Sequence, residues 1–459
     1  MKKKYRKTVS LCVVLFSGIL IVGCTAGNGG DASGDDAANT DKSVGTPVLI
    51  HEDQGSNGDD CVDRVAEETF RFSLCTCRDA TSMGVLETGS FDSLIDKYWL
   101  TDYEVDDFGA AIGVNRNLYV PGVLSVGGSA LLSGPDGVRL PGLATVQGDF
   151  KVDGTVEFEG VLNVARDLVI GENFVNFGYA NIGRDIHLGG AMSIPLLTVP
   201  KGQIIKKESD VLPPCACGAD EILDIEGIVA DARTDHQDDI ISINPDWLTA
   251  IVGYMNLDLP PGRYYFSNIA GAGKLTLKVT GHTALFVDGD MLLAGDLDIE
   301  MGDNATLDIF IAGDFQIAGA NNFGSVTRPS ALRFYVGGAN DVTLTGYTAF
   351  VGNLYAPNAN VILTGASFIY GSIFAGDFLA MGDTAIYFDR DINRGGDDCG
   401  PPDVFDSDID SDSGEVDTDS DPGGSCENYG DACVTDSDCC EPLVCDDGQC
   451  KELNWPVLE

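Results

Sequence analysis

A short motif recurs through the middle of this 459-residue chain and limits what the chain can fold into. Each copy has an apolar pair, a turn that often ends in Asp or Asn, an alternating apolar run and a Gly. Examples are TVQGDFKVDG at 145–154, ALFVDGDMLLAG at 284–295 and SIFAGDFLAMG at 372–382. In the first half, aligned apolar residues lie 12, 20, 18, 18 and 17 positions apart. These residues are Val114, Val126, Val146, Val164, Ile182 and Val199.

The motif predicts short strands whose side chains alternate between two faces. One unit cannot bury its apolar side chains, but stacked units can, because each coil then pairs its backbone with the coils on either side. A β-sandwich also has short strands and Gly turns, but we do not expect it to keep one motif order through ten units. We therefore predict an all-β fold, a right-handed parallel β-helix (solenoid) with one flanking α-helix and a small disulfide-knot module.

The turns of this motif carry a series of acidic residues. Each of them follows a Gly or an Arg, and we interpret them as corner residues, because Asp hydrogen-bonds to nearby backbone in tight turns. In coils stacked in register they form a column of like charges, which repel unless Arg166, Arg184 or a cation neutralises them. A calcium ladder is therefore the alternative. The series comprises Asp149, Asp167, Asp185, Asp290, Asp314 and Asp377.

The composition along the chain predicts its domain organisation. Residues 219–233 have apolar side chains at helical spacing and acids in the first turn, which predicts one helix packed on the solenoid and covering or flanking its open end. The expected segments are a signal peptide (1–23), a disordered tether (24–60), an N-terminal cap (61–108), the first part of the β-helix (109–205), a helical insertion (206–258), the second part (259–400), an acidic disordered linker (401–425), a cystine-knot-like module (426–450) and a tail (451–459).

The N-terminus predicts export and a lipid anchor. A basic MKKKYRK precedes an apolar stretch that is short for a membrane span and ends in Ile-Val-Gly-Cys at 21–24. This resembles a bacterial lipobox, which implies cleavage before Cys24 and lipidation of that residue; an ordinary signal peptide is the alternative. Thr25, rather than Asp, follows Cys24, and by analogy with Gram-negative sorting this favours an outer membrane lipoprotein on the surface or periplasmic side.

The charge of the chain excludes some partners. With 72 acidic and 27 basic residues the formal net charge is −45, and neither nucleic acid nor anionic lipid is an expected partner, because both bind Lys and Arg. The membrane contact expected is the lipid anchor alone. A surface protein, a glycan and a second copy of the chain stay open as partners.

The acidic linker is another place where calcium binding is considered. An EF-hand starting at Asp408 would need Gly at its sixth position and Glu at its twelfth, where Ser413 and Asp419 stand. A self-repelling, extended linker is therefore expected, with weak calcium binding as the alternative. The candidate ligands are Asp406, Asp408, Asp410 and Asp412, and no other cofactor is expected.

Twelve of the 14 cysteines are left once Cys12 leaves with the signal peptide and Cys24 is lipidated, and disulfides are expected in an exported chain. Cys75–Cys77 and Cys215–Cys217 form two CxC pairs, each expected to bond to a distant segment, with a zinc site or redox activity as alternatives. Cys61 and Cys399 lie at the two ends of the body, where disulfide bonds would hold the caps in place. The other six are Cys426, Cys433, Cys439, Cys440, Cys445 and Cys450.

These last six, spaced C-x6-C-x5-CC-x4-C-x4-C, resemble a knottin and are similar to Dickkopf-type modules. The resemblance implies the pairs Cys426–Cys440, Cys433–Cys445 and Cys439–Cys450; spacing alone leaves the connectivity open. Segments of the body such as FDSLIDKY, PPCACGADEILDIEGIVADAR, RFYVGG and GNLYAPNANVILTG resemble an uncharacterised bacterial β-helix family. It occurs in exported lipoproteins and pilus-associated proteins, and its coils are reminiscent of bactofilins. The resemblance covers roughly 61–400 and implies no catalytic residues.

No catalytic motif was found in the sequence. The four histidines, His51, His187, His236 and His282, lack paired-ligand spacing, and neither a nucleophile elbow nor a phosphate loop is present. We therefore expect a lipid-anchored structural or interaction protein of the cell envelope, with adhesion among its roles, whose β-helical scaffold displays the knottin-like module. A polysaccharide-binding or polysaccharide-degrading β-helix protein is the alternative, and by fold analogy alone. An ice- or mineral-binding face would need a regular Thr or Asp array, which the outward positions lack.

Overall fold

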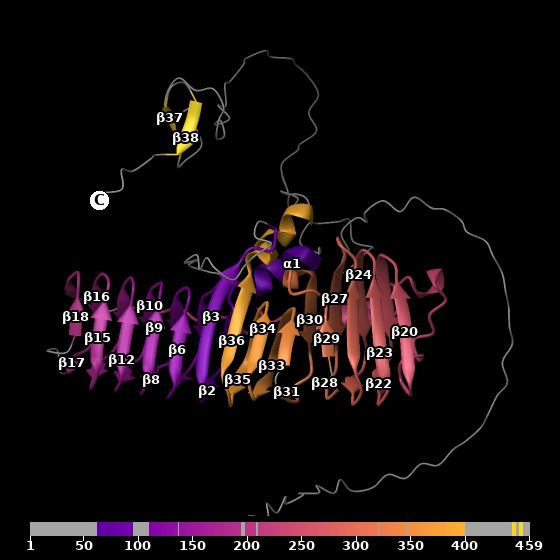
Figure 1. Cartoon of the computed structure of the whole chain (residues 1–459), viewed down its shortest axis with the longest axis horizontal. Helices are drawn as coiled ribbons and strands as arrows, with labels where there is room; N and C mark the ends of the chain where they lie inside the picture. The colour runs from indigo at the N-terminus through magenta and orange to yellow at the C-terminus, as the bar shows by residue number, and fades with distance from the viewer. Residues whose placement is uncertain are drawn as a thin grey trace, which may run out of the picture. The chain divides into compact units, whose positions relative to one another are not determined.

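The computed structural model describes residues 62–94, 110–135, 137–193, 198–207, 210–319, 321–345, 348–399, 443–446 and 449–452. Within them the chain is mostly β and winds into a parallel β-solenoid of about 13 turns (Figure 1). The predicted parallel β-helix is therefore confirmed. The described helices are α1 (Val62–Thr69) and α2 (Ile225–Ala232), with 3-10 turns η3 (Asp238–Ile240), η4 (Pro329–Ala331) and η5 (Arg390–Cys399).

The N-terminal half of the solenoid has three faces, and each coil adds one strand to each face. On the first face lie β1 (Leu74–Thr76), β4 (Ile112–Val114), β7 (Ala130–Leu132), β10 (Phe150–Val152), β13 (Leu168–Ile170), β16 (Ile186–Leu188) and β19 (Ile204–Lys206). On the second lie β2 (Ala80–Ser82), β5 (Leu118–Tyr119), β8 (Val138–Leu140), β11 (Val156–Phe158), β14 (Phe174–Asn176) and β17 (Met192–Ser193). On the third lie β3 (Val85–Phe91), β6 (Val123–Val126), β9 (Leu143–Val146), β12 (Val161–Val164), β15 (Tyr179–Ile182) and β18 (Thr198–Pro200).

The C-terminal half continues the same three faces. The first carries β21 (Gly262–Phe266), β24 (His282–Val287), β27 (Thr306–Ile311) and β30 (Leu332–Val336); the second carries β22 (Ile269–Gly271), β25 (Met291–Leu293), β28 (Phe315–Ile317) and β31 (Val342–Thr345). The third carries β20 (Tyr254–Leu259), β23 (Lys274–Val279), β26 (Leu297–Met301), β29 (Asn321–Phe323), β32 (Thr348–Val351), β34 (Ser367–Tyr370) and β36 (Thr384–Asp389). Two long strands, β33 (Asn353–Thr364) and β35 (Ile373–Ala380), pair on both the first and second faces.

The two halves meet at a seam where the last coil of the chain pairs with the first. β35 pairs in parallel with β1, placing Leu74 opposite Ile373, and with β2, placing Ala80 opposite Phe378. β36 pairs with β3 over six residues, from Leu86 opposite Thr384 onward. In Figure 1 the indigo strands of the N-terminal coil lie beside the orange strands of the last coil, in the middle of the solenoid.

The order of the coils in space therefore differs from their order in the chain. The chain winds outward from the seam to β19, restarts at β20 and winds back to the seam at β35 and β36. We call residues 207–253, which join these two ends, the crossing segment. It contains α2, which contacts β24 and β27 on the first face.

The first coil corrects the expected domain plan. Residues 61–108 were expected to form an N-terminal cap, but β1, β2 and β3 each pair with a strand on either side and so lie inside the solenoid. The sequence motif does not reveal this, because the last coil supplies apolar partners as suitable as those of a neighbour in the chain. Among the described residues of this segment, α1 precedes the coil and lies outside it, in contact with η5.

Two details of the repeat alignment also change. Val114 and Val126 belong to β4 and β6 of one coil, so their spacing is not a coil repeat. Ile182 stands opposite Pro200 rather than Val199, which restores a repeat of one coil per 18 residues at that point.

The predicted helix at 219–233 is shorter than expected, because α2 begins only at Ile225. Asp224 caps its N-terminus and accepts a hydrogen bond from the backbone N–H of Gly227 at 3.0 Å. Ile225, Val229 and Ala232 are buried, whereas Ile222 lies before the helix. The helix packs on an outer face of the solenoid and does not cover an open end.

The core follows from the alternation that the sequence predicts. In three-residue strands such as β10, β11 and β13 the first and third side chains are buried and the middle one is partly exposed. Inward residues stack from coil to coil; Phe158 and Phe174 lie with ring centroids 5.5 Å apart. Each full coil therefore adds a layer of buried apolar side chains, and that burial is the main stabilising term of such a fold.

A column of glycines turns the chain from the second face to the third. A Cβ placed on Gly142, Gly160 or Gly178 would lie 1.8–1.9 Å from the carbonyl oxygen of the glycine one coil earlier. The same contact links Gly295 to Gly273 and Gly382 to Gly365, and Gly122 to Gly84 across the first coil of the N-terminal half. The glycine at this corner is therefore needed for close approach of successive backbones.

The chain beyond residue 402 forms a separate unit, Asp403–Glu459. Its described strands, β37 (Leu443–Asp446) and β38 (Gln449–Glu452), pair antiparallel and place Cys445 opposite Cys450. None of the helices that the structure describes is long and apolar enough to cross a membrane.

Candidate functional site

The acidic residues of the turns form hydrogen-bonded columns along the solenoid. The Oδ1 of Asp149 accepts from the backbone N–H of Asp167 at 3.1 Å, and Asp167 accepts from Asp185 at 2.9 Å. Asp185 in turn accepts from Gln203 at 2.7 Å. The corner role predicted for these residues is confirmed with one change: each carboxylate bonds the backbone of the next coil, not that of its own turn.

Two further stretches follow the same rule. Asp290 accepts from the N–H of Asp314 at 2.9 Å, and across the seam Asp377 accepts from the N–H of Asp79 at 3.0 Å. Basic side chains offset part of the charge: Lys151 lies 3.1 Å from Asp149, and the Nε of Arg78 lies 2.7 Å from Asp377. One oxygen of each carboxylate is thus committed to the fold, which makes these residues structural.

One group of side chains among the described residues has the spacing of a metal site. The ligand atoms of Asp167, Asp185 and His187 lie within 4.8 Å of one another, and all three residues are partly exposed. Since Asp167 and Asp185 already accept backbone N–H groups, each has one oxygen left for a cation. The arrangement is explained by the corner column alone, and the calcium ladder stays an untested alternative.

Many predicted site residues lie outside the described residues. These are the lipidation candidate Cys24, the calcium candidates Asp406, Asp408, Asp410 and Asp412, and the cysteines Cys61, Cys426, Cys433, Cys439 and Cys440. The side chain of Cys399, at the end of η5, is also outside the description, as are those of Cys445 and Cys450.

The two CxC pairs are joined to each other by disulfides. Cys75 bonds Cys215 and Cys77 bonds Cys217, each closing 140 residues of chain. Neither pair closes on itself, as expected, and the equal spacing within both pairs is the sequence signal for this parallel pairing. The bonds attach the crossing segment to β1 at the seam. Gly113, opposite Cys75 on β4, leaves them room: a Cβ there would lie 3.1 Å from both Sγ atoms.

An aromatic column lies next to these disulfides on the outside of the first face. Successive strands place its members in register, and the last is opposite Cys75 of β1. Phe310 stacks on Tyr335 with centroids 4.6 Å apart, and the rings pack in one cluster with α1 and α2. The members are Tyr265, Phe286, Phe310, Tyr335, Tyr355 and Phe374. The sequence analysis missed this column, although an aromatic residue at the outward position of six coils is a visible signal.

A buried ion cluster lies beside the column, under α1. The guanidinium of Arg333 on β30 lies 2.8 Å from Asp308 on β27 and 2.5 Å from Asp63 on α1, and Arg333 and Asp308 are each only 2% exposed. Burial raises the pKa of Asp308 to about 7, against the opposing charge of Arg333. Burial alone would lower the pKa of Arg333, but Asp308 and Asp63 raise it above its usual range. One arginine thus faces two carboxyls, and burial favours the protonated form of one of them, Asp308.

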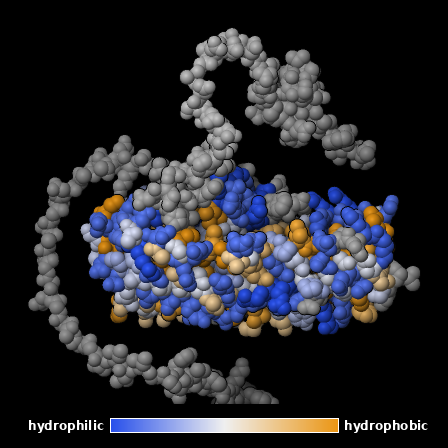
Figure 2. All heavy atoms as spheres, turned by 180° about the vertical axis from the view of Figure 1, so that it is seen from behind, coloured by the Kyte–Doolittle hydropathy of each residue, from blue (hydrophilic) through white to orange (hydrophobic). Residues whose placement is uncertain are grey.

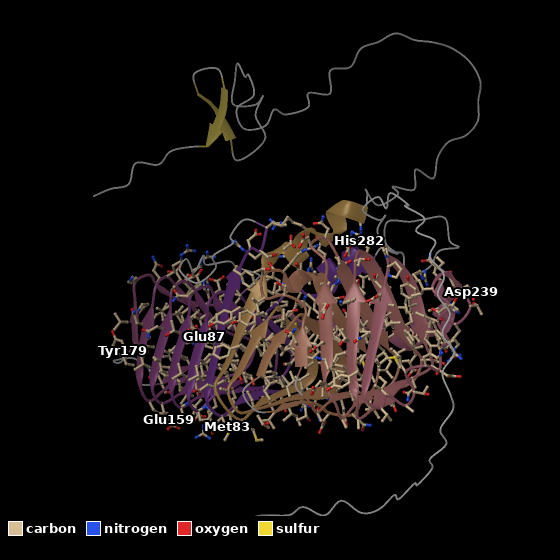
Figure 3. All side chains as sticks on the ribbon, turned by 45° about the vertical axis from the view of Figure 1, so that its right-hand side comes forward. Met83, Glu87, Glu159, Tyr179, Asp239 and His282 are labelled. Carbon is tan, nitrogen blue, oxygen red and sulfur yellow. A yellow bond between two sulfur atoms is a disulfide. The ribbon has the colours of Figure 1, made fainter. Side chains whose placement is uncertain are left out.

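The cluster borders a polar cavity of about 250 Å³ between the first face and η5. His282, labelled in Figure 3, lines it and lies 3.0 Å from the hydroxyl of Thr306. Arg394, also lining the cavity, is paired with Asp92 at 2.6 Å. Two of the arginines that line the cavity, Arg333 and Arg394, form ion pairs with protein carboxylates. Hydrophilic residues cover most of the solenoid when it is seen from behind (Figure 2).

Comparisons with known proteins match the chain to one family model and one solved structure. Residues 217–394 match a family described as "Domain of unknown function (DUF7305)", which takes in α2 and nearly the whole C-terminal half. No curated protein matches. Among solved structures the chain is similar to an ice binding protein from an Antarctic bacterium, Flavobacteriaceae, with 11% identity and a TM-score of 0.15. That match covers 71% of this chain and 97% of the other, and at this level of similarity it carries no argument about function.

Proposed function

We propose that this protein is a structural and interaction scaffold of the bacterial cell envelope, exported and lipid-anchored at Cys24, whose solenoid displays the module at 426–450. The observation that carries the proposal is the pair of disulfides, Cys75–Cys215 and Cys77–Cys217, on a continuous β-solenoid. Disulfides of this kind form and persist in oxidising compartments, so a location outside the cytoplasm agrees with the expected signal peptide.

The architecture supports a mechanical role. Backbone pairing runs unbroken through the seam, where β35 and β36 pair with the first coil. The disulfides hold the crossing segment on β1, and the same segment then contacts β24 and β27 through α2. Both halves are therefore tied by hydrogen bonds and by covalent bonds, which suits a rigid spacer.

The anchor is tested by a matched pair of cysteine variants. Cys24→Ala removes the proposed lipid acceptor, whereas Cys12→Ala changes a cysteine within the apolar part of the signal. We expect the wild-type protein and Cys12→Ala to sediment with membranes and partition into detergent, and Cys24→Ala to be recovered in the aqueous fraction. Equal membrane recovery of Cys24→Ala and Cys12→Ala would contradict the anchor, since several acyl chains on one residue are what makes such binding stable.

A second candidate function is polysaccharide binding. One observation favours it: the outward surface of β6, β9, β12 and β15, on the third face, carries an uncharged, amphipathic array in a strongly acidic protein. A degrading enzyme would need two carboxyl groups free to act on the glycan. Asp167 and Asp185, the closest acidic neighbours in the columns, are instead engaged by backbone N–H groups.

A further inference from the structure

The outward positions of four neighbouring strands, β6, β9, β12 and β15, together with the residue that follows each strand, form what we call the flat face. They stand in three rows, because the strands pair in exact parallel register. The first row is Val123, Leu143, Val161 and Tyr179; the second is Ser125, Thr145, Asn163 and Asn181; the third is Gly127, Gln147, Ala165 and Gly183.

All twelve of these positions are uncharged. The neighbouring faces of the same coils do carry outward charges, with Lys151 on β10 and Arg139 and Glu157 on β8 and β11. Along the stack of strands, charge returns at Glu87 on β3 and at Lys201 after β18. Along the strands it returns just beyond the three rows, at Glu159, Arg166 and Arg184. Glu87 and Tyr179 are labelled in Figure 3. In a chain with a net charge of −45, an uncharged surface of this size is a distinct chemical environment.

The first two rows have complementary chemistry. Leu143, Val161 and Tyr179 are 42%, 37% and 46% exposed, so the first row offers apolar surface that no described segment covers. The second row offers hydroxyl and amide groups, which donate and accept hydrogen bonds. Side chains two residues apart on a strand lie ~7 Å apart, so the apolar row and the polar row run side by side across the strands.

The glycine corner next to the first row holds successive coils close together at a regular spacing. Gly122, Gly142, Gly160 and Gly178 each precede a strand of the flat face and pack directly on the backbone of the coil before. Successive strands of such a stack lie ~4.8 Å apart, and they carry the two rows at that repeat.

We propose that the flat face binds a neutral polysaccharide chain laid across the strands. Such a chain presents C–H surfaces, which pack on the apolar row with Tyr179 as an aromatic platform, and hydroxyl groups, which pair with the second row. A neutral polymer needs no opposite charge on the protein, whereas an anionic polymer is repelled by the net charge of −45. This inference deepens the second candidate function and is independent of the lipid anchor.

Two other occupants fit less well. Four strands and about five residues along each enclose only roughly 300 Å², below the ~800 Å² per partner of a stable protein interface, so a second copy would gain too little. Ice would need groups of one height in each row, and Ser125, Thr145, Asn163 and Asn181 differ in length along the second row.

The test compares two lysine substitutions of the same residue type. Val161→Lys puts a charge in the apolar first row of the flat face, and Val175→Lys puts the same charge at the outward position of β14 on the second face. The full chain, purified from membranes in detergent, is incubated with microcrystalline cellulose, chitin and a soluble neutral β-glucan. Circular dichroism confirms that both variants fold.

We expect the wild-type protein and Val175→Lys to bind at least one of these polymers. Val161→Lys should bind roughly tenfold more weakly or worse, because the bound polymer would cover a lysine that has no partner, and burying such a charge is costly. The proposal is overturned if none of the polymers retains the wild-type protein, or if both variants bind alike. It is also overturned if Val161→Lys instead abolishes ice shaping or a concentration-dependent dimer. Each of these outcomes leaves the membrane-fractionation test of Cys24 unaffected.

Discussion

At the residue scale, the trio of Arg333, Asp308 and Asp63 shows how charged groups can be buried on the outer surface of a β-solenoid, between the first face and α1. Arg333 and Asp308 are nearly inaccessible, and the guanidinium bonds both carboxyls. A single positive charge cannot balance two negative ones, so the cluster is closest to neutral when Asp308 keeps its proton. Asp63 reaches this cluster from α1, which is how the helix is fixed over the aromatic column.

Asp308→Asn should change how stability depends on pH. Because burial raises the pKa of Asp308 to about 7, the folded chain holds a proton that the unfolded chain releases between about pH 4 and 7. The wild-type residue therefore adds most stability at low pH and loses it as pH rises toward 7. Asn cannot ionise, so in denaturant titrations the variant should gain relative to wild type with rising pH, by up to a few kcal/mol. Parallel pH curves for the two proteins would contradict this reading.

Arg333→Met should be far more damaging than Asp308→Asn. It leaves Asp308 and Asp63 buried side by side without a cation, and breaking a buried ion pair in this way costs about 3–5 kcal/mol. Chemical unfolding should show this loss, and the double variant Arg333→Met with Asp308→Asn should recover part of it. No recovery in the double variant would mean that Arg333 acts by packing rather than by charge.

Gly160→Ala should destabilise the solenoid through the backbone of the coil before it. The added Cβ would lie 1.9 Å from the carbonyl oxygen of Gly142, so the corner must move, at a cost of roughly 1–3 kcal/mol or more. Gly302→Ala is the matched control, because its Cβ would meet ordinary contacts of 3.4 Å and longer. Equal melting temperatures for the two variants would show that close approach at this corner is not required.

At the element scale, the crossing segment lacks the repeat motif and is held on the solenoid by disulfides and hydrogen bonds. Two disulfides attach it to β1, and the side chain of Asn115 on the N-terminal half donates to the carbonyl oxygen of Cys215 at 2.8 Å. The hydroxyl of Tyr355 accepts from the N–H of Leu223 at 3.1 Å. The segment needs these bonds because it is not held between two coils.

Removing the two disulfides should be strongly non-additive. Each closes the same loop of 140 residues, so Cys75→Ser with Cys215→Ser leaves the loop closed by Cys77–Cys217 and should cost little beyond local packing. Removing all four cysteines opens the loop and should cost about 5 kcal/mol by the chain-entropy estimate. Thermal unfolding and limited proteolysis of 207–224 measure both effects. Two equal, additive losses would contradict the shared-loop argument.

At the scale of the whole molecule, the end of the solenoid formed by β18 and β19 is chemically different from the middle. Among the described strands, β18 and β19 pair on one side only. There Pro200 stands at the position of buried Ile182, and Lys206 at that of buried Leu188. Pro and Lys on an edge strand hinder the pairing of a further strand, so these residues prevent another coil or another copy of the chain from adding to this end.

Pro200→Ile combined with Lys206→Leu should weaken that protection. The open edge would then resemble an interior coil, and the protein should form concentration-dependent assemblies, measured by sedimentation velocity. Val199→Ile is the control, because Val199 stands at an outward position and already exposes 47% of its surface. A double variant that stays monomeric would show that other residues block this end.

The sequence predicted the repeating architecture but not its order in space. Alternation and closing glycines specify a parallel coil wherever they occur, so the solenoid followed from the motif. The seam did not, because Leu74 and Ile112 match each other no better than Leu74 matches Ile373, and all three are inward aliphatic residues. For the pairing of the CxC cysteines, the sequence offers one signal, which is that both pairs have the same spacing. The flat face was overlooked because its rows emerge only when outward residues of four coils are placed side by side.

The central claim is that a rigid solenoid holds the C-terminal module away from the membrane, and protease shaving of intact cells tests it most directly. Mass spectrometry of the released material should find cleavage within the predicted acidic linker, 401–425, and release of the intact segment 426–450. The described strands of the coils, from β1 to β19 and from β20 to β36, should remain uncut. If nothing is released until the outer membrane is opened, the protein does not display its module on the surface, and the account of it as an outward-facing scaffold is contradicted.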